Sequence, residues 1–334
     1  MSLPQDVHRA RMATLAPAHR YDGSESFETW QTRARAKLLD LLGLPLTLCD
    51  DRMTVEYERT LENFTEIRFQ FQSEEGYFVP CHFLTPNGAT GPLPVVICLQ
   101  GHSKGMHISL ARPKYPGDEE SINGGDRDFA IRAVREGFCA LTVEQRCFGE
   151  CGGTEKGPDC NDASMTALLL GRTTIGERVW DVQRAIDVLE KHFPQADLSR
   201  IICMGNSGGG TTALFAGCVE TRIRYCMPSC YFCAFEDSIG AMRHCACNYV
   251  PSLRLCFDAG DLAGLVAPRP MVVVAGREDP IFPFPGVEKA YAVAQRYYQA
   301  ANAPDALRLV VGEGGHRFYA DAAWPVMKAL MEQA

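Results

Sequence analysis

A short apolar run that ends in a glycine-rich turn constrains this chain more than any other feature. Residues 201–204 read Ile-Ile-Cys-Met and predict a buried strand, and residues 205–209 follow at once as Gly-Asn-Ser-Gly-Gly. Residues 211–216 then predict a helix. A G-x-S-x-G turn between a strand and a helix is typical of a nucleophile elbow, which raises the serine oxygen above the end of the strand.

The glycines of this turn have a steric reason. Side chains two positions before and two positions after Ser207 would collide with the neighbouring strand and helix. The amino end of the following helix also offers N–H donors to an oxyanion that develops beside the serine. The alternatives are a purely structural turn and a phosphate loop, and the phosphate loop is disfavoured because no lysine follows the glycines.

The flanking sequence predicts an α/β fold. Near-continuous apolar strands alternate with helical segments, which is typical of a mostly parallel central sheet covered by helices on both faces. The strands are predicted at residues 94–99, 138–143, 201–204, 223–228, 270–275 and 307–311. The helices are predicted at residues 126–136, 177–192, 286–301 and 322–333.

The first part of the chain follows a different pattern. Residues 67–71 alternate apolar and polar side chains, and together with residues 77–84 they predict an antiparallel N-terminal hairpin. Ser26 and Gly43 bracket a predicted helix with one apolar stripe. This helix is expected to lie against the main body of the protein.

These patterns predict the domain organisation. We expect an N-terminal helical extension over residues 1–55 and one α/β domain over residues 56–334. Residues 229–267 fit the alternation of strands and helices poorly, and they predict an insertion over the carboxyl edge of the sheet, where such folds place their sites. Its aromatic side chains are expected to wall a pocket there. They are Tyr231, Phe232, Phe235, Tyr249 and Phe257.

Two further residues are candidate partners of Ser207. A serine hydroxyl needs a base within hydrogen-bond reach, and the base needs an orienting acid. Asp279 follows the strand at 270–275, and His316 follows the strand at 307–311, so both lie where the chain order Ser, acid, His requires them. Taken singly, they would read as a turn carboxylate and a surface histidine. Glu278 is the nearest rival for the acid.

An oxyanion hole needs two N–H donors that point to one position. Gly208, directly after the serine, is expected to supply one donor. The loop after the strand at 94–99 is expected to supply the other, through the N–H of His102 or, failing that, of Gly101. Gly101 and Arg146 are the candidate substrate contacts. For the loop around Arg146, a plain glycine-rich turn is the favoured alternative.

The chain holds 15 cysteines, an odd number that does not suit a disulfide framework. Several lie in predicted core strands, where a free thiol behaves as a small apolar side chain. Residues 226–256 are rich in Cys and His, which are the ligands of zinc sites. No C-x-x-C pair recurs at zinc-finger spacing, so we predict reduced packing cysteines and no metal.

Composition limits the partners. The formal net charge is -8 without a basic run, which argues against nucleic acid. No apolar run reaches membrane-spanning length, and residues 1–15 lack the apolar core of a signal peptide, so we expect a cytoplasmic protein. The expected partner is a small-molecule ester, without a cofactor. The sequence leaves open whether the chain forms a homo-oligomer.

With these motifs, the chain resembles the α/β-hydrolase superfamily, and within it the dienelactone hydrolase and acetyl xylan esterase-like branches. The resemblance rests on the elbow, on Arg178-Val179-Trp180-Asp181, and on the approach to the acid from Asp261 to Pro283. Two departures stand out. Gln100 precedes Gly101 where acetyl xylan esterases have histidine, and Ser207 stands where dienelactone hydrolases have cysteine.

The resemblance implies a serine hydrolase that cleaves small carboxylic esters, with acetyl esters as one candidate, through a Ser207–His316–Asp279 triad and an acyl-enzyme. A peptidase of the prolyl-oligopeptidase type shares the elbow and the triad order, but it usually carries a propeller domain for which the chain before residue 90 is too short. The alternative from another class is a non-catalytic or metal-binding module that uses the Cys-rich insertion.

Overall fold

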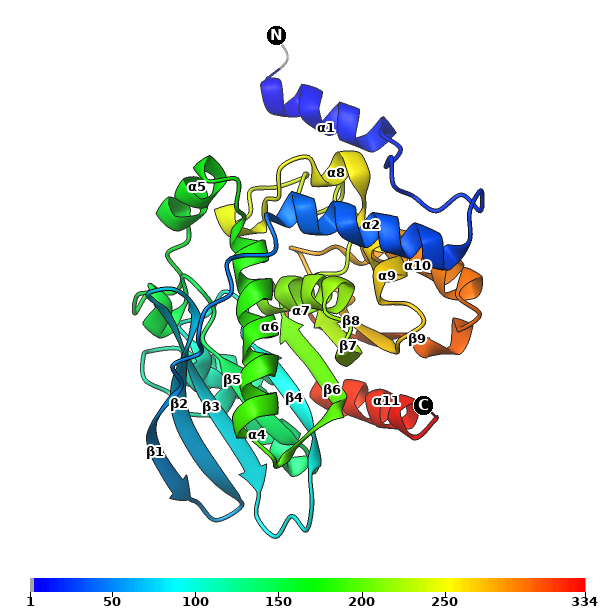
Figure 1. The fold of residues 1–334 in the computed structure, drawn as a ribbon. Helices are drawn as coiled ribbons and strands as arrows, with labels where there is room; N and C mark the ends of the chain where they lie inside the picture. Colours follow the sequence, from blue (N-terminus) through cyan, green and yellow to red (C-terminus); the bar gives the residue numbers. More distant parts are fainter. Residues whose placement is uncertain (1–2, 334) are drawn as a thin grey trace.

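The computed structural model describes residues 3–333 and contains one nine-stranded sheet between two layers of helices (Figure 1). The strands are β1 (Thr54–Thr60), β2 (Phe64–Glu74), β3 (Tyr77–Pro86), β4 (Leu93–Leu99), β5 (Cys139–Val143), β6 (Ala196–Asn206), β7 (Ile223–Ser229), β8 (Met271–Gly276) and β9 (Leu307–Gly312). Their order is β1-β2-β3-β5-β4-β6-β7-β8-β9. Pairs from β5 to β9 are parallel, and the pairs that link β1, β2, β3 and β5 are antiparallel. The predicted mostly parallel sheet with an antiparallel N-terminal part is confirmed.

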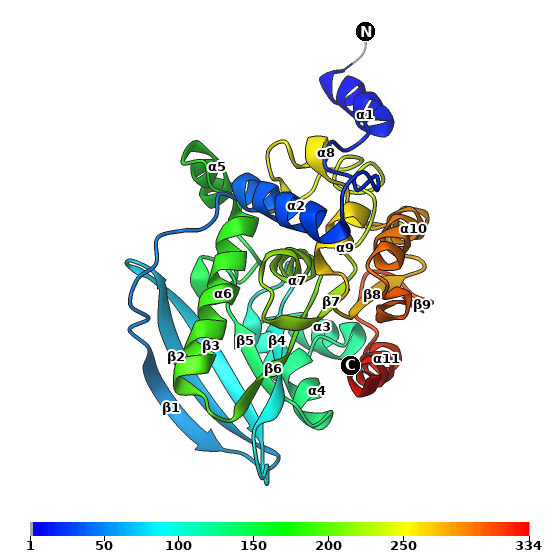
Figure 2. The same ribbon diagram turned by 45° about the vertical axis from the view of Figure 1, so that its right-hand side comes forward.

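The helices are α1 (Pro4–Thr14), α2 (Phe27–Leu42), α3 (Asp118–Gly125), α4 (Phe129–Arg135), α5 (Asn161–Leu169), α6 (Thr174–His192), α7 (Gly208–Val219), α8 (Leu253–Cys256), α9 (Ala259–Val266), α10 (Phe284–Ala300) and α11 (Ala320–Gln333). Helices α2, α6, α7, α9 and α10 share one apolar core with one face of the sheet. Helices α4 and α11 close a second core on the other face (Figures 1 and 2). No helix in residues 3–333 is both long and apolar enough to cross a bilayer.

Helix α2 has the bounds that its sequence predicts. The Ser26 side chain accepts a hydrogen bond from the N–H of Thr29, and Gly43 ends the helix in the left-handed region at φ 74°. Trp30, on the buried face, is fully inaccessible to solvent, and its Nε1 donates to the carbonyl oxygen of His19 at 2.8 Å. Its ring lies 4.9 Å from that of Tyr297 in α10, so α2 is part of the core and not an appendage.

Six elements were not predicted from the sequence: α1, β1, α3, α5, α8 and α9. All seven residues of the edge strand β1 are exposed, so no alternation of burial marks it. Helix α3 ends in two glycines, which are among the poorest helix formers. Helix α5 leaves Met165 and Leu169 exposed, so its apolar residues do not form the usual buried stripe.

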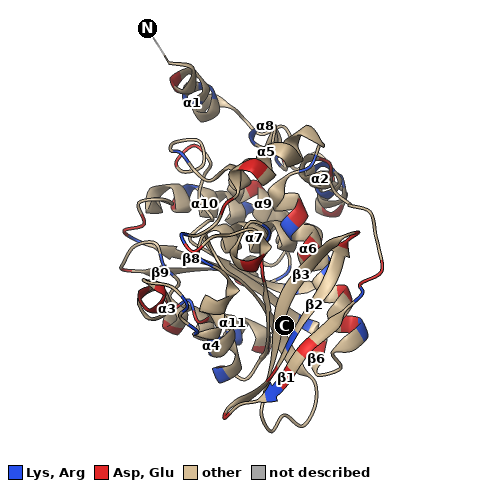
Figure 3. Cartoon of the chain, turned by 90° about the vertical axis from the view of Figure 1, so that its left-hand side faces the viewer, with Lys and Arg blue, Asp and Glu red and all other residues tan. Residues whose placement is uncertain are grey.

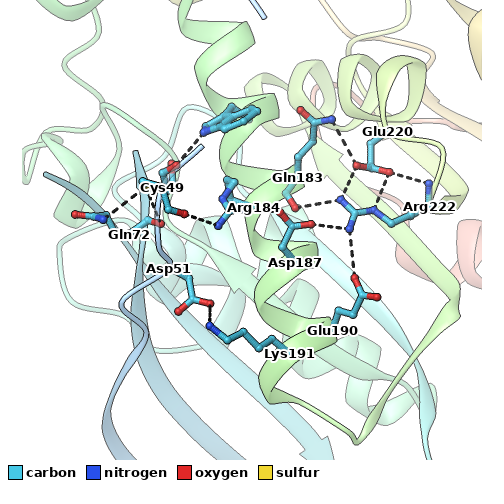
Figure 4. A network of polar contacts seen from close by, with 12 residues as sticks. Cys49, Asp51, Gln72, Gln183, Arg184, Asp187, Glu190, Lys191, Glu220 and Arg222 are labelled. Carbon is cyan, nitrogen blue, oxygen red and sulfur yellow. Dashed lines mark hydrogen bonds and ion pairs between the residues drawn. The ribbon is translucent and has the colours of Figure 1, made fainter. Parts of the chain in front are cut away.

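Helix α6 is fastened on two sides by a polar network (Figure 4). On one side, Asp51, in the segment before β1, pairs with Lys191 at 2.9 Å, and Arg184 donates to the carbonyl oxygen of Cys49 at 3.2 Å. On the other side, Asp187 pairs at 2.6 Å with Arg222, in the turn between α7 and β7. The network therefore holds the N-terminal segment, α6 and the elbow helix α7 in one arrangement.

Replacement of Trp30 by alanine is expected to destabilise the whole domain. The substitution leaves a large cavity between α2, α9 and α10, which typically costs about 3–5 kcal/mol of unfolding free energy. Thr32→Ala, on the exposed face of the same helix, is the matched control and should change the unfolding free energy by less than about 0.5 kcal/mol. Urea unfolding followed by fluorescence measures both. Equal stability of the two variants would show that α2 is dispensable to the core.

Candidate active site

The nucleophile elbow lies at the carboxyl end of the central strand β6. The strand ends at Asn206, and α7 begins at Gly208, so Ser207 alone makes the turn. Its backbone has φ 57° and ψ -122°, which a residue with a side chain rarely adopts. Hydrogen bonds hold it there: the Ser207 N–H donates to Ser229 and its carbonyl oxygen accepts from Thr211, both at 2.8 Å.

The glycines of the elbow are required by close backbone contacts. A Cβ atom on Gly205 would lie 2.7 Å from the carbonyl oxygen of Leu99, and one on Gly209 would overlap that same oxygen. A Cβ on Gly208 would lie 2.8 Å from Cε1 of His102. The steric reason inferred from the sequence is thus present, with strand β4 as the main neighbour.

Asp279 and His316 meet beyond the ends of β8 and β9. His316 Nδ1 lies 2.7 Å from Asp279 Oδ2, and the other carboxylate oxygen accepts the N–H groups of Ile281 at 2.8 Å and Phe282 at 3.1 Å. The Phe282 ring stacks on the imidazole with centroids 5.8 Å apart. The imidazole is therefore fixed on one edge and one face, and Nε2 is its free nitrogen.

Burial and charge separate the two neighbouring acids. The Asp279 side chain is almost fully buried, whereas Glu278 is exposed. Burial alone would raise the pKa of Asp279, but the hydrogen bond and charge of His316 outweigh it and lower that pKa. Asp279 is therefore ionised at neutral pH and can accept a hydrogen bond from the Nδ1–H of His316. The thiol of Cys230 is near this pair, and burial raises its pKa to about 12, so it stays protonated.

Loop 100–105, which follows β4, faces the elbow. The Gln100 side chain donates to the Ser109 hydroxyl at 2.5 Å and to the carbonyl oxygen of Arg127 at 2.8 Å. The Gln145 amide donates to the Gln100 carbonyl oxygen and accepts the Thr212 hydroxyl at 2.7 Å, which links this loop to α7. Gln100 thus connects loop 100–105 to Ser109 and to the backbone at Arg127.

The far end of the loop is held by a buried carboxyl group. Both oxygens of Glu144 accept the N–H of Met106, at 3.1 and 3.2 Å, and one also accepts the N–H of Glu150 at 3.3 Å. Burial raises the pKa of Glu144 to about 7, against the effect of these N–H donors. The carboxyl group therefore joins the two loops that follow β4 and β5.

The N–H groups of the two candidate oxyanion donors are without an acceptor in the described part of the chain. Gly208 is the first residue of α7, so its N–H has no partner within the helix. Within residues 3–333, the N–H of His102 has no hydrogen-bond acceptor either. Gly101 comes so close to the elbow that a Cβ atom would lie 2.9 Å from that of Ser207, so its small size is needed for packing.

A cavity of about 310 Å³ opens above Ser207. Ser207, Gly208, His102 and His316 share its wall with two basic side chains, Arg127 and Arg243, and the remaining lining residues are Met242, His244, Cys245, Asn248, Ile281 and Phe282. None of the lining residues in the described range 3–333 carries a carboxylate. The basic lining contrasts with the net charge of -8 of the whole chain, whose acidic and basic residues are interspersed over the elements in Figure 3.

Two sequence expectations need correction. Arg146 lies outside this cavity: it is buried, donates twice to Asp181 at 2.9 Å, and stacks on the Tyr77 ring at 4.1 Å, so it is an internal ion-pair residue. The segment 229–267 does reach the cavity, but its aromatic rings do not line it, because Tyr231, Phe232 and Phe257 are buried in the core.

Two basic residues that line the cavity, Arg127 and Arg243, were missed from the sequence. Arg127 falls in the helix predicted at 126–136, but α4 begins only at Phe129, so Arg127 lies in the turn between α3, which the sequence did not predict, and α4. Burial lowers the pKa of its guanidinium, which nevertheless remains charged at neutral pH. Two groups of side chains have metal-ligand geometry: Cys230 with Asp279 and His316, and His102 with Cys160, Cys245 and Cys247. The first contains the acid–imidazole pair itself.

Comparison with known proteins agrees with this fold. Over 291 residues, the chain is 28% identical to "Putative hydrolase YtaP" of Bacillus subtilis (strain 168), covering 84% of this chain and 92% of that protein. A "putative acetyl xylan esterase" from Bacteroides fragilis superposes with a TM-score of 0.79 at 17% identity, over 94% of this chain and 83% of the other. A glucuronoyl esterase from Solibacter usitatus gives 0.70 at 16% identity, over 96% and 99%.

A family model also matches most of the chain. The model described as "Abhydrolase family" matches residues 7–310, which includes α2, the elbow and Asp279. His316 lies just beyond the matched range. The expected esterase-like branch has its counterpart in the structural relatives, whereas the dienelactone hydrolase resemblance stays a prediction. With a matching model over most of its length and the corresponding sheet topology, the chain belongs to the Abhydrolase family of the α/β-hydrolase superfamily.

Proposed function

We propose that this protein is a serine esterase that hydrolyses small carboxylic esters through an acyl-enzyme. One observation carries the proposal. Ser207, on a strained elbow, shares a cavity with His316, and the imidazole Nδ1 of His316 is paired with the buried carboxylate of Asp279. This combination of nucleophile, base and orienting acid is what acyl transfer at neutral pH requires.

The steps follow from these positions. Ser207 Oγ bonds to the acyl carbon while its proton passes to His316 Nε2, and the N–H groups of Gly208 and His102 stabilise the oxyanion. The oxyanion collapses, the ester C–O bond breaks, and the alcohol leaves with the proton from His316. A water molecule then attacks the acyl-enzyme, with His316 again as the base, and releases the acid. Asp279 holds the imidazole in its tautomer and stabilises the imidazolium.

Several observations favour an ester over a peptide substrate. The structural relatives are named as acetyl xylan and glucuronoyl esterases, and acetyl esters of sugars are accordingly one candidate class. In residues 3–92, the chain forms two helices and three strands of the common sheet, in place of the propeller domain usual in prolyl-oligopeptidase-type enzymes.

Cavity charge refines the substrate class. Arg127 and Arg243 line the cavity, and neither forms an ion pair with a carboxylate of the part of the chain that the structure describes. Arg243 is exposed, whereas Arg127 is partly buried, and an unpaired guanidinium in a partly buried site is a strong donor for a carboxylate or similar anion. We therefore propose that an ester with a free acidic group is bound better than a neutral ester of equal size.

Loss of the nucleophile tests the mechanism. Ser207→Ala should keep the fold and lower kcat on nitrophenyl acetate by about 10³-fold or more, as the loss of a triad member does elsewhere. Ser199→Ala, at the opposite, exposed end of the same strand, is the matched control and should retain full turnover. Turnover by the Ser207 variant close to that of the unmodified enzyme would exclude the elbow serine as nucleophile.

The choice of acid is tested by two neighbouring substitutions. Asp279→Asn removes the anion beside Nδ1 and favours the wrong tautomer, so kcat should fall by about 10³–10⁴-fold. Glu278→Gln, one residue away and exposed, should change kcat less than twofold, by the general tolerance of exposed sites. Steady-state kinetics on one nitrophenyl ester measures both. The reverse order of effects would reassign the acid to Glu278.

The charge preference is tested with a pair of substrates. Arg127→Gln should raise KM for nitrophenyl hemisuccinate about tenfold, since a charge-assisted hydrogen bond contributes about 1.5–3 kcal/mol. KM for neutral nitrophenyl acetate should stay the same. Arg277→Gln, which removes an exposed arginine outside the cavity, should alter neither value. An equal rise of KM for both esters would show that Arg127 does not read substrate charge.

A further inference from the structure

Four metal-ligand side chains converge beside the elbow. One ligand atom from each of His102, Cys160, Cys245 and Cys247 lies within 4.8 Å of the other three. They come from three separate segments: loop 100–105, the residue that precedes α5, and the turn at η3 (Ala246–Asn248). Packing alone gives no reason for three thiols and an imidazole from distant segments to point at a common centre.

The spacing suits a tetrahedral cation. Zinc binds thiolate at about 2.3 Å and imidazole at about 2.0–2.1 Å, so the ligand atoms of a tetrahedral site lie roughly 3.5–3.8 Å apart. His102 Nε2 lies 3.1 Å from Cys247 Sγ, and no two ligand atoms of the set are more than 4.8 Å apart. The ligand spacing expected of a tetrahedral zinc site falls between these two distances. The three cysteines form no disulfide, so their thiols can bind a metal.

A buried arginine balances the charge of such a site. A divalent ion with three thiolates and a neutral imidazole carries a net charge of minus one, which is costly to bury without a counter-charge. Arg178, on α6, is only 2% exposed, and its Nη2 donates to Cys160 Sγ at 3.5 Å. The same guanidinium is anchored on the carbonyl oxygen of Arg146 at 2.7 Å. A hydrogen bond to a thiolate ligand from outside the metal shell is a usual feature of metal sites.

We propose that His102, Cys160, Cys245 and Cys247 form a structural site for a divalent thiophilic cation, Zn²⁺. Thiolate and imidazole ligands select against Mg²⁺ and Ca²⁺. Four protein ligands complete a tetrahedron and leave no open position, so the ion holds segments together and takes no part in the chemistry. The proposal departs from the sequence prediction of no metal, which rested on the lack of a recurring C-x-x-C pair. The one such pair, Cys230 and Cys233, is not among the ligands.

The site would position the oxyanion donor, a consequence that rests on the proposed function. His102 is the candidate oxyanion donor of loop 100–105, and its ring packs on Gly208. With Nε2 on the ion, loop 100–105 is tied to α5 and η3 and cannot drift from the elbow. His102 then acts as a positioning residue through its ring and as an oxyanion donor through its backbone.

Metal content tests the site without any substrate. In protein purified without an affinity tag or chelator, inductively coupled plasma mass spectrometry should measure about one zinc per chain, since such sites bind their metal tightly. Cys245→Ser combined with Cys247→Ser should lower it at least tenfold, and Cys233→Ser, a buried cysteine outside the set, should leave it unchanged. A wild-type protein that stays below about a tenth of a zinc per chain after incubation with Zn²⁺ would overturn the proposal. So would an intact mass that reveals a disulfide within the set.

A measurement on the wild-type chain covers the case in which the double variant fails to fold. Co²⁺ exchanged into the intact protein should show the intense visible bands of a tetrahedral ion and a sulfur-to-cobalt charge-transfer band. The weak spectrum of octahedral, oxygen-bound Co²⁺ would contradict the thiolate site. Ser207→Ala should hold as much zinc as the wild-type protein, so the failure of the metal site and the failure of the esterase mechanism give different results.

Discussion

The site depends on one close approach of two backbone segments, the turn at Ser207 and the end of strand β4. Glycines at 205 and 209 contact the carbonyl oxygen of Leu99, and Gly101, two residues further along, contacts Asn206 and Ser207. None of these contacts leaves space for a Cβ atom. The distance from the serine to loop 100–105 is therefore set by main-chain atoms, which do not change rotamer, and this is the kind of rigid support that an oxyanion hole needs.

Buried polar side chains directly after β5 hold loop 100–105 close to the elbow. Gln145 joins the Gln100 carbonyl oxygen to the Thr212 hydroxyl, and Glu144 gathers the N–H groups of the two loops. Because they are buried and satisfied by several partners, each of them restricts the loops more than a surface contact would. The polar network around α6 likewise fixes the N-terminal segment before β1 against the domain (Figure 4).

Local signals were readable in the sequence, and non-local ones were not. The elbow, the helix at 27–42 and the order of Ser207, Asp279 and His316 follow from short motifs and from the period of apolar residues. The position of Arg127 could not be predicted, because it depends on α3, a helix that ends in two glycines. Arg146 was assigned to the substrate site because the sequence cannot show that its guanidinium forms an ion pair with Asp181. The convergence of His102 with Cys160 joins segments far apart in the chain, for which no spacing rule exists.

The contact between Gly208 and the ring of His102 has a consequence for how this chain can vary over time. A larger residue at position 208 would displace the ring, and a smaller one at position 102 would leave a void against the elbow. Because the two side-chain positions are in contact, the effects of changes at them are coupled and not additive. The residue at position 102 therefore influences which residues position 208 can accept, and sequence change at the two positions is expected to be correlated.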